Sequence, residues 1–253
     1  MTIGFRQAQP IALAAFLGLF LGTLLGVLIQ RLPREDHLRL FRRPRCTRCG
    51  QPLGWELVPL LGYLLQRGRC RHCGKPIPVF FPLVELLTGT VFALLVWRHG
   101  PSGTAGLYAV FSLALILTLF LDWLHRDIYY LIIIPPAALA LLSPLWGNNL
   151  RAELQSRLAG LGVGLIFFGL LFLLGQVLFR SQALGLGDVW LAGSIGAMAG
   201  FYGALWALSL GIVLAAVAAG LLLLLRRHSA GDYMPYGAYL CLAALGYFCF
   251  GPI

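Results

Sequence analysis

Long apolar runs separated by short polar segments dominate the chain. A transmembrane helix needs about 20 mainly apolar residues, and eight stretches reach or approach that length: residues 11–29, 79–97, 104–121, 128–146, 158–179, 188–203, 204–225 and 235–252. The sixth and seventh are divided only by a weak break at Phe201-Tyr202-Gly203, and one fused helix would give seven spans. Since the 38 residues from 188 to 225 are too many for one crossing, the pattern predicts an all-α polytopic membrane protein with about eight transmembrane helices.

Composition supports a membrane protein. The chain is 59% hydrophobic and only 11% charged, whereas a soluble domain is about 25% charged. The same numbers exclude a disordered chain. The first apolar run resembles a signal peptide in position, but only Arg6 precedes it and no small-residue cleavage site follows, so we interpret it as a retained helix.

Positive charge is unevenly distributed. The net charge is +10, and eleven of the 19 Lys+Arg lie in the loop 31–78. If the eight segments cross in alternate directions, fifteen basic residues fall on one side and four on the other. The positive-inside rule then places the loop in the cytoplasm and both termini outside. The charge therefore orients the chain beside anionic lipid headgroups, and no nucleic-acid partner is expected.

Four cysteines in this loop form two pairs, Cys46 with Cys49 and Cys70 with Cys73, separated by twenty residues. Two CxxC pairs, each followed by glycine, are typical of a closed, structural Cys₄ zinc site. A loop this short has too small a core to fold alone, and a metal supplies the missing stability. Disulfides or free thiols are the alternative, and a cytoplasmic location disfavours disulfides.

Two of the nine acids stand at predicted helix ends, Asp122 and Asp188, and a third, Glu85, lies within the second apolar stretch. Acids in membrane segments are costly and indicate function. Two carboxylates at a dry boundary share one proton and can serve as general acid and base, the chemistry of aspartic proteolysis. Alternatively, Asp188 caps its helix and Asp122 pairs with Arg126.

These motifs together resemble the prepilin peptidases, the type IV leader peptidase family of GxGD intramembrane aspartyl peptidases. The resemblance covers nearly the whole chain. It rests on the residues 22–33, the cysteine pairs, Pro59-Leu60-Leu61-Gly62-Tyr63-Leu64, Pro82-Leu83-Val84-Glu85, Leu121-Asp122, Gly185-Leu186-Gly187-Asp188 and Pro235-Tyr236-Gly237-Ala238.

The resemblance implies an enzyme of the bacterial inner membrane. It would remove the leader from type IV prepilins and type II secretion pseudopilins at the cytoplasmic face, and methylate the new N-terminus with S-adenosylmethionine. Asp122 and Asp188 would be catalytic, with Gly185 and Gly187 in the active-site loop. Asp127 is a rival to Asp122, but Pro135 lines up with the family only if Asp122 is chosen.

The chain also departs from the family pattern. Trp190 stands where lysine is common, Tyr129-Tyr130 replaces Pro-Asp, and Gly26 replaces asparagine. Glu85 has two interpretations: an ion pair with a loop arginine, or a part in binding the methyl donor or the leader's positive charge.

The sequence thus predicts a first transmembrane helix in 1–30, a zinc-binding loop domain in 31–78, and helices two to eight with the peptidase site in 79–253. A proton-coupled transporter that uses the intramembrane acids is the alternative function. A zinc-bearing scaffold whose acids only cap helices is a third. Acids at one edge of the bilayer, and not at its midplane, disfavour the transporter.

Overall fold

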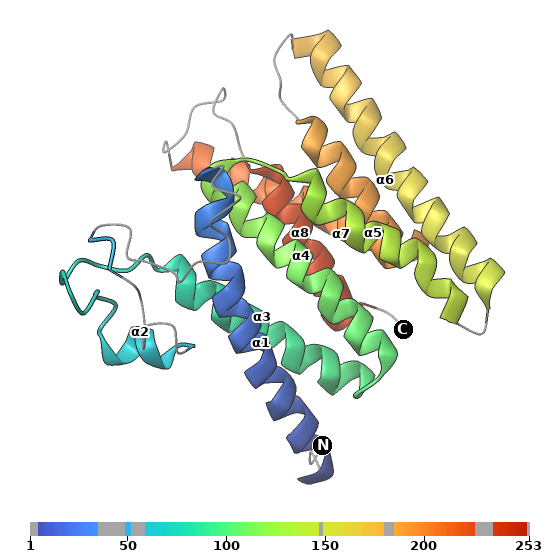
Figure 1. Cartoon of the computed structure of the whole chain (residues 1–253). Helices are drawn as coiled ribbons and strands as arrows, with labels where there is room; N and C mark the ends of the chain where they lie inside the picture. The colour runs from blue at the N-terminus through green and yellow to red at the C-terminus, as the bar shows by residue number, and fades with distance from the viewer. Residues whose placement is uncertain are drawn as a thin grey trace. The chain divides into compact units, whose positions relative to one another are not determined.

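A computed structural model describes residues 5–34, 49–51, 59–146, 149–179, 185–225 and 235–251. The described chain is built from helices and contains no named strand (Figure 1). Five helices are long and apolar enough to cross a membrane, and α5 and α8 are shorter apolar helices. The predicted all-α, multi-pass architecture is therefore confirmed.

The helices follow the predicted apolar stretches closely. Their bounds are α1 Phe5–Arg31, α2 Leu61–Leu65, α3 Phe80–His99, α4 Gly103–His125, α5 Tyr130–Leu142, α6 Leu150–Phe179, α7 Leu186–Leu224 and α8 Tyr236–Phe250. Short 3₁₀ turns continue α1 over Leu32–Arg34 and α5 over Ser143–Trp146. Of the described α-helices, α2 is the one that lies wholly within the predicted loop domain 31–78.

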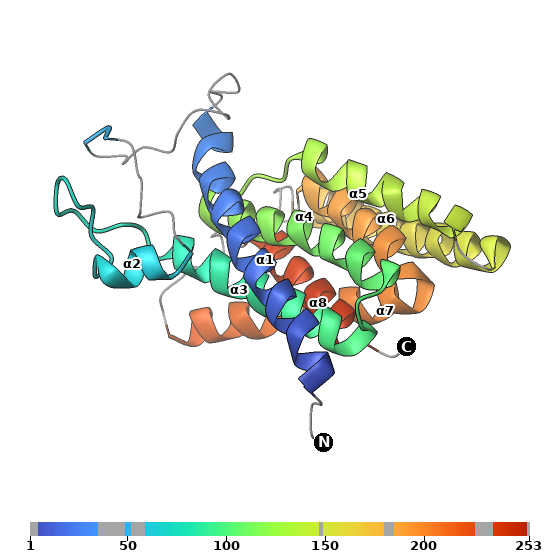
Figure 2. The same ribbon diagram turned by 60° about the horizontal axis from the view of Figure 1, so that its bottom comes forward.

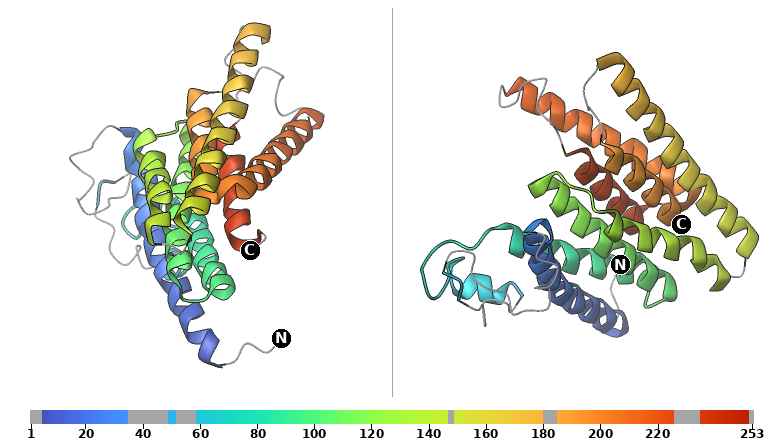
Figure 3. Two further views of the ribbon diagram at one scale, coloured as in Figure 1. Left: turned by 90° about the vertical axis from the view of Figure 1, so that its right-hand side faces the viewer. Right: turned by 45° about the horizontal axis from the view of Figure 1, so that its top comes forward.

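The 39-residue α7 contains the break that the sequence predicted between its sixth and seventh segments. The break lies at Gly200, directly before the predicted break at Phe201-Tyr202-Gly203 and three residues before the predicted segment end at 203. Its φ is +73° and its ψ is −178°. Glycine adopts a positive φ without steric cost, so the helix changes direction at this residue (Figure 3).

Two side chains of α6 form hydrogen bonds with the backbone groups of α7 that the break leaves without helical partners. The Ser156 hydroxyl accepts a hydrogen bond from the backbone N–H of Phe201 at 3.1 Å. The Arg157 guanidinium donates to the carbonyl oxygens of Ala197 at 3.3 Å and Met198 at 3.1 Å. Backbone groups freed by a break in an apolar helix need such partners, because lipid offers none.

The chain divides into two compact units, Met1–Phe120 and Leu121–Ile253. In the first unit α1 packs along α3 (Figure 2). Gly18, Gly22 and Gly26 recur at every fourth position of α1, which brings the backbones close. A Cβ at Gly22 would lie 2.6 Å from the Cα of Glu85, and one at Gly18 would lie 2.7 Å from the carbonyl oxygen of Thr88.

In the second unit α6 and α7 lie side by side, also through glycines (Figure 1). A Cβ at Gly160 would collide with the carbonyl of Gly196, and one at Gly164 with the carbonyl of Ala192. The helix α8 packs on α7, where a Cβ at Gly211 would lie 2.7 Å from Leu240.

Candidate functional site

Two buried carboxylates lie at helix ends within the second unit. Asp122 is in the last turn of α4 and Asp188 is in the first turn of α7. Each residue is only 1% exposed. Ile128 lies against Gly187, which directly precedes Asp188, and against Gly237, which lies beside the carboxylate of Asp122. The structure thus brings together two residues that are 66 positions apart in the chain.

In each of these carboxylates one oxygen is hydrogen-bonded and the other is not. Oδ2 of Asp122 accepts the backbone N–H of Ala238 at 2.8 Å. Oδ2 of Asp188 accepts the backbone N–H of Gly185 at 3.1 Å. Oδ1 of both residues is buried and has no hydrogen-bond partner among the described residues. A buried polar atom without a partner is unusual and points to a role that requires it.

Asp188 also caps the start of α7, as one of the two interpretations expected. The N–H of Asp188 donates to the carbonyl of Gly185, and the N–H of Gly185 donates to Oδ2 of the Asp188 carboxylate. This pairing resembles half of a capping box, and it uses only Oδ2. Oδ2 of Asp122 accepts its hydrogen bond from the N–H of Ala238 at the start of α8, and not from Arg126, the alternative partner that the sequence suggested.

The glycines around the acids permit close approach. Gly185 supplies the N–H that holds Asp188, and a Cβ at Gly187 would lie 3.0 Å from the Cβ of Ile128. Sequence reasoning gave no role to Gly237, at the start of α8. A Cβ at this position would lie 3.0 Å from Oδ2 of Asp122 and 3.1 Å from Leu191. The only signal in the sequence was the Pro-Tyr-Gly motif that opens the last helix.

Two departures from the family pattern contact each other beside the acids. The rings of Tyr130 and Trp190 meet edge to face, with centroids 6.4 Å apart and planes at 80°. Tyr130 is 44% exposed and Trp190 is 47% exposed. Such pairs contribute about 0.5–1.5 kcal/mol beyond burial, so the two replacements form one interaction.

Three of the four predicted metal ligands lie together in the first unit. The Sγ atoms of Cys49, Cys70 and Cys73 are within 4.8 Å of one another, and those of Cys49 and Cys70 are 4.0 Å apart. Cys46 lies outside the described residues. Four sulfurs at about 2.3 Å from a tetrahedral Zn²⁺ are about 3.8 Å apart, so this thiol cluster fits a zinc ion.

The glycine after each cysteine pair has the conformation that such a turn requires. Gly50 has φ +71° and Gly74 has φ +66°. The N–H of Gly74 donates to the carbonyl of Cys70 at 2.8 Å, and the N–H of Cys70 donates to the carbonyl of Lys75 at 2.9 Å. These bonds close a tight turn around the second pair of cysteines.

Glu85 is buried in α3 with 6% exposure. Its Oε1 accepts the Thr23 hydroxyl of α1 at 2.8 Å, and its Oε2 accepts the backbone N–H of Leu60 at 2.8 Å. No arginine of the described part is among its hydrogen-bond partners. The predicted partner is an arginine of loop 31–78, and several arginines of that loop lie outside the described residues. Within the described part, two neutral donors hold Glu85.

The fold and the paired acids define a class: helical membrane proteins with two buried carboxylates at helix ends. Comparison with known proteins then gives the family. Residues 16–99 match the bacterial peptidase A24 N-terminal domain, and residues 109–225 match the type IV leader peptidase family. The second match includes Asp122 and Asp188, and the first includes the four cysteines and Glu85.

Relatives similar to the chain are named "Prepilin leader peptidase/N-methyltransferase". That of Pseudomonas putida is 30% identical over 95% of this chain and 91% of its own length. That of Myxococcus xanthus is 36% identical over 85% of this chain, and the match spans 63% of its own length. No solved structure matches. The chain belongs to the type IV leader peptidase family.

Proposed function

We propose that this protein is an aspartic endopeptidase that cleaves the leader from prepilins, with Asp122 and Asp188 as its catalytic pair. One observation carries the proposal: each carboxylate is held through Oδ2 by a backbone N–H and keeps a buried, unpartnered Oδ1. The family and the names of its relatives supply the substrate class. The position of both acids at helix ends disfavours a proton-relaying transporter, whose sites lie near the midplane.

The reaction follows from a water molecule held between the two Oδ1 atoms. The ionised carboxylate takes a proton from this water, whose oxygen then bonds to the carbonyl carbon of the scissile peptide. The protonated carboxyl gives its proton to the carbonyl oxygen. When the tetrahedral intermediate collapses, the C–N bond breaks and the amine leaves with the proton first taken from water. One hydroxyl of the intermediate returns its proton to the second carboxylate as the new carboxyl group forms, which restores the starting pair. The N–H groups of Gly185 and Ala238 hold the carboxylates in place throughout.

The proposed setting is the bacterial inner membrane, with loop 31–78 and the acids at the cytoplasmic face and both termini outside. The support is the one-sided distribution of basic residues. A leader that remains in the cytoplasm meets the acids where its apolar segment enters the bilayer. Prepilins, type II secretion pseudopilins and membrane lipid are the proposed partners.

We also propose that Cys46, Cys49, Cys70 and Cys73 hold one structural Zn²⁺ that joins the two arms of loop domain 31–78. The domain lies between a first helix, 1–30, and the helices of 79–253. A Cys₄ site leaves no position open for a substrate, so the ion stabilises the loop and takes no part in the reaction. The support is the distance between the three described thiols.

N-methylation with S-adenosylmethionine is proposed from the relatives' names alone. Glu85 is the candidate for binding the methyl donor. Each of its carboxylate oxygens accepts one hydrogen bond within the protein, so it would contact a donor only through its remaining lone pairs.

The test is cleavage of a prepilin by purified protein in detergent. Asp122→Asn and Asp188→Asn should each slow cleavage at least about 100-fold, while the helical circular dichroism stays unchanged. Asp127→Asn is the matched control and should cleave at the wild-type rate. Retained cleavage by either of the first two variants would refute the assignment, and loss in the control would favour Asp127.

A further inference from the structure

Leu60 has a backbone conformation that leucine rarely adopts. Its φ is +55° and its ψ is −46°. The N–H of Leu61 donates to the carbonyl of Pro59 at 2.5 Å, which closes a three-residue γ-turn around Leu60. The form of this turn with positive φ is rare and strained, and strained backbone persists only where surrounding contacts hold it.

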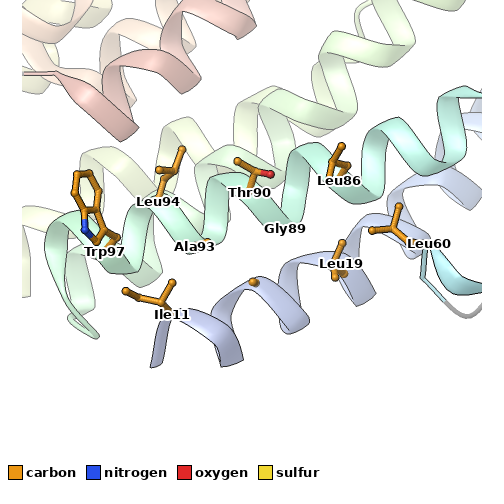
Figure 4. Close-up of a pocket in the computed structure, with 10 residues that line it drawn as sticks. Ile11, Leu19, Leu60, Leu86, Gly89, Thr90, Ala93, Leu94 and Trp97 are labelled. Atoms are coloured by element: carbon orange, nitrogen blue, oxygen red, sulfur yellow. The ribbon is translucent and has the colours of Figure 1, made fainter. Parts of the chain in front are cut away.

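The contact that holds this turn is the carboxylate of Glu85. The turn points the N–H of Leu60 at Oε2, and the bond measures 2.8 Å. Hydrogen bonds to a carboxylate are stronger than those to a neutral acceptor. The Leu60 side chain contributes to the same anchoring. It lines one end of an apolar groove of about 380 Å³ between α1 and α3, near Leu19 and Leu86 (Figure 4).

The second oxygen of Glu85 reaches the other helix of the pair. Oε1 accepts the hydroxyl of Thr23, which also lies 3.3 Å from the carbonyl oxygen of Leu19. The approach depends on Gly22, because a Cβ there would lie 2.6 Å from the Cα of Glu85. One side chain of α3 therefore binds α1 and the loop at once.

The bonded turn directs the part of the loop that carries two thiols. The carbonyl of Leu60 accepts the N–H of Leu64 at 2.9 Å and so begins α2. The N–H of Gly68 then donates to the carbonyl of Tyr63 at 2.8 Å, two residues before Cys70. A shift at Leu60 is therefore transmitted along a continuous hydrogen-bonded path to the thiol cluster.

We propose that Glu85 is a positioning residue that fixes the cysteine-bearing loop on the α1–α3 pair by holding the strained turn at Leu60. This role goes beyond the proposed peptidase activity and does not depend on it. In this role each of its two oxygens accepts a hydrogen bond, one from Thr23 and one from Leu60.

Hydrogen–deuterium exchange of full-length protein in detergent tests this proposal, read at the amides of Leu64, Gln66 and Gly68. Glu85→Ala should speed their exchange roughly tenfold or more, because a buried hydrogen bond to a charged group is lost. Adding Leu60→Gly should slow exchange again by roughly fivefold, because glycine accepts the positive φ without strain. Leu60→Ala is the matched control, since it also removes the side chain but keeps the strain, and it should give no rescue.

Unchanged exchange in Glu85→Ala would overturn the proposal, as would equal rescue by glycine and alanine. If Glu85→Ala does not fold, two other variants decide. Glu85→Gln keeps an acceptor for the N–H of Leu60, so the loop amides should stay protected from exchange. In the protein with Glu85 unchanged, the loop amides should exchange more slowly in Leu60→Gly than in Leu60→Ala. Failure of either expectation would refute the proposal that Glu85 holds the turn at Leu60. Because the readout is exchange in the loop, the result is independent of whether the protein cleaves prepilin.

Discussion

Replacing Gly237 by alanine should slow leader cleavage while leaving the fold intact. The added Cβ would lie 3.0 Å from Oδ2 of Asp122 and 3.1 Å from Leu191. Gly237 is not among the residues with positive φ, so alanine is compatible with its backbone. The change therefore acts through space, by pushing the start of α8 away from the carboxylate that Ala238 holds at 2.8 Å.

The size of the expected loss in rate follows from the hydrogen bond between Ala238 and Asp122, which the added Cβ would stretch. A hydrogen bond to a charged group contributes about 1.5–3 kcal/mol, which corresponds to a loss of roughly 10- to 150-fold in rate if it is needed in the transition state. Misplacement of a reacting group by about 1 Å has a cost of similar size. We expect kcat to fall by about this factor, with KM little changed, because the contact concerns the acids and not the remote parts of the substrate.

The assay is prepilin cleavage under saturating substrate, with a thermal melt to check the fold. Gly246→Ala on the same helix is the matched control, because its Cβ would have no neighbour closer than 3.8 Å. It should cleave at the wild-type rate. A Gly237→Ala enzyme as fast as this control would refute the reasoning, since the acid pair would then not depend on the start of α8.

Three further predictions concern the other sites. Cys70→Ser should reduce the zinc content from about one ion per chain to nearly none by elemental analysis, and undiminished zinc would contradict the thiol cluster. Gly200→Ala should destabilise the protein by about 1–3 kcal/mol in a thermal melt, because of its positive φ, whereas Gly220→Ala, with nothing within 4 Å, should not; equal melts would contradict this. A double-mutant cycle of Tyr130→Ala and Trp190→Ala should give a coupling of about 0.5–1.5 kcal/mol, and additive effects would show that the rings act independently.

The apolar pattern was sufficient to predict the helices and the break in α7, because hydrophobic length is written directly in the sequence. It placed the break slightly too late, at Phe201-Tyr202-Gly203, since the exact position depends on Gly200 and on partners in α6. Ser156 and Arg157 carry no signal of this role, because one polar residue near a helix start is ordinary. The sequence does not show which backbone groups of α7 these two side chains bind.

The acids and glycines show a similar limit. Asp122 and Asp188 were predictable because charge is rare in apolar helices, and the structure brings them together. The role of Gly237 depends on a contact between α4 and α8 across 116 positions of sequence, which no local pattern contains. Glu85 was noted in the sequence as an acid within an apolar stretch. One of its partners is the backbone N–H of Leu60, which has an unusual positive φ, and residue type alone does not predict such a backbone conformation.

The break in α7 has a consequence for how the protein is made. Its freed carbonyls and amide are satisfied by Arg157 and Ser156 of α6, so we expect α6 to stabilise the bent form of α7 in lipid. The ribosome completes α6 first, and the partners are therefore in place when α7 enters the bilayer. Biogenesis of this unit follows the order of the chain, and a fragment that lacks α6 should insert α7 as a straighter helix.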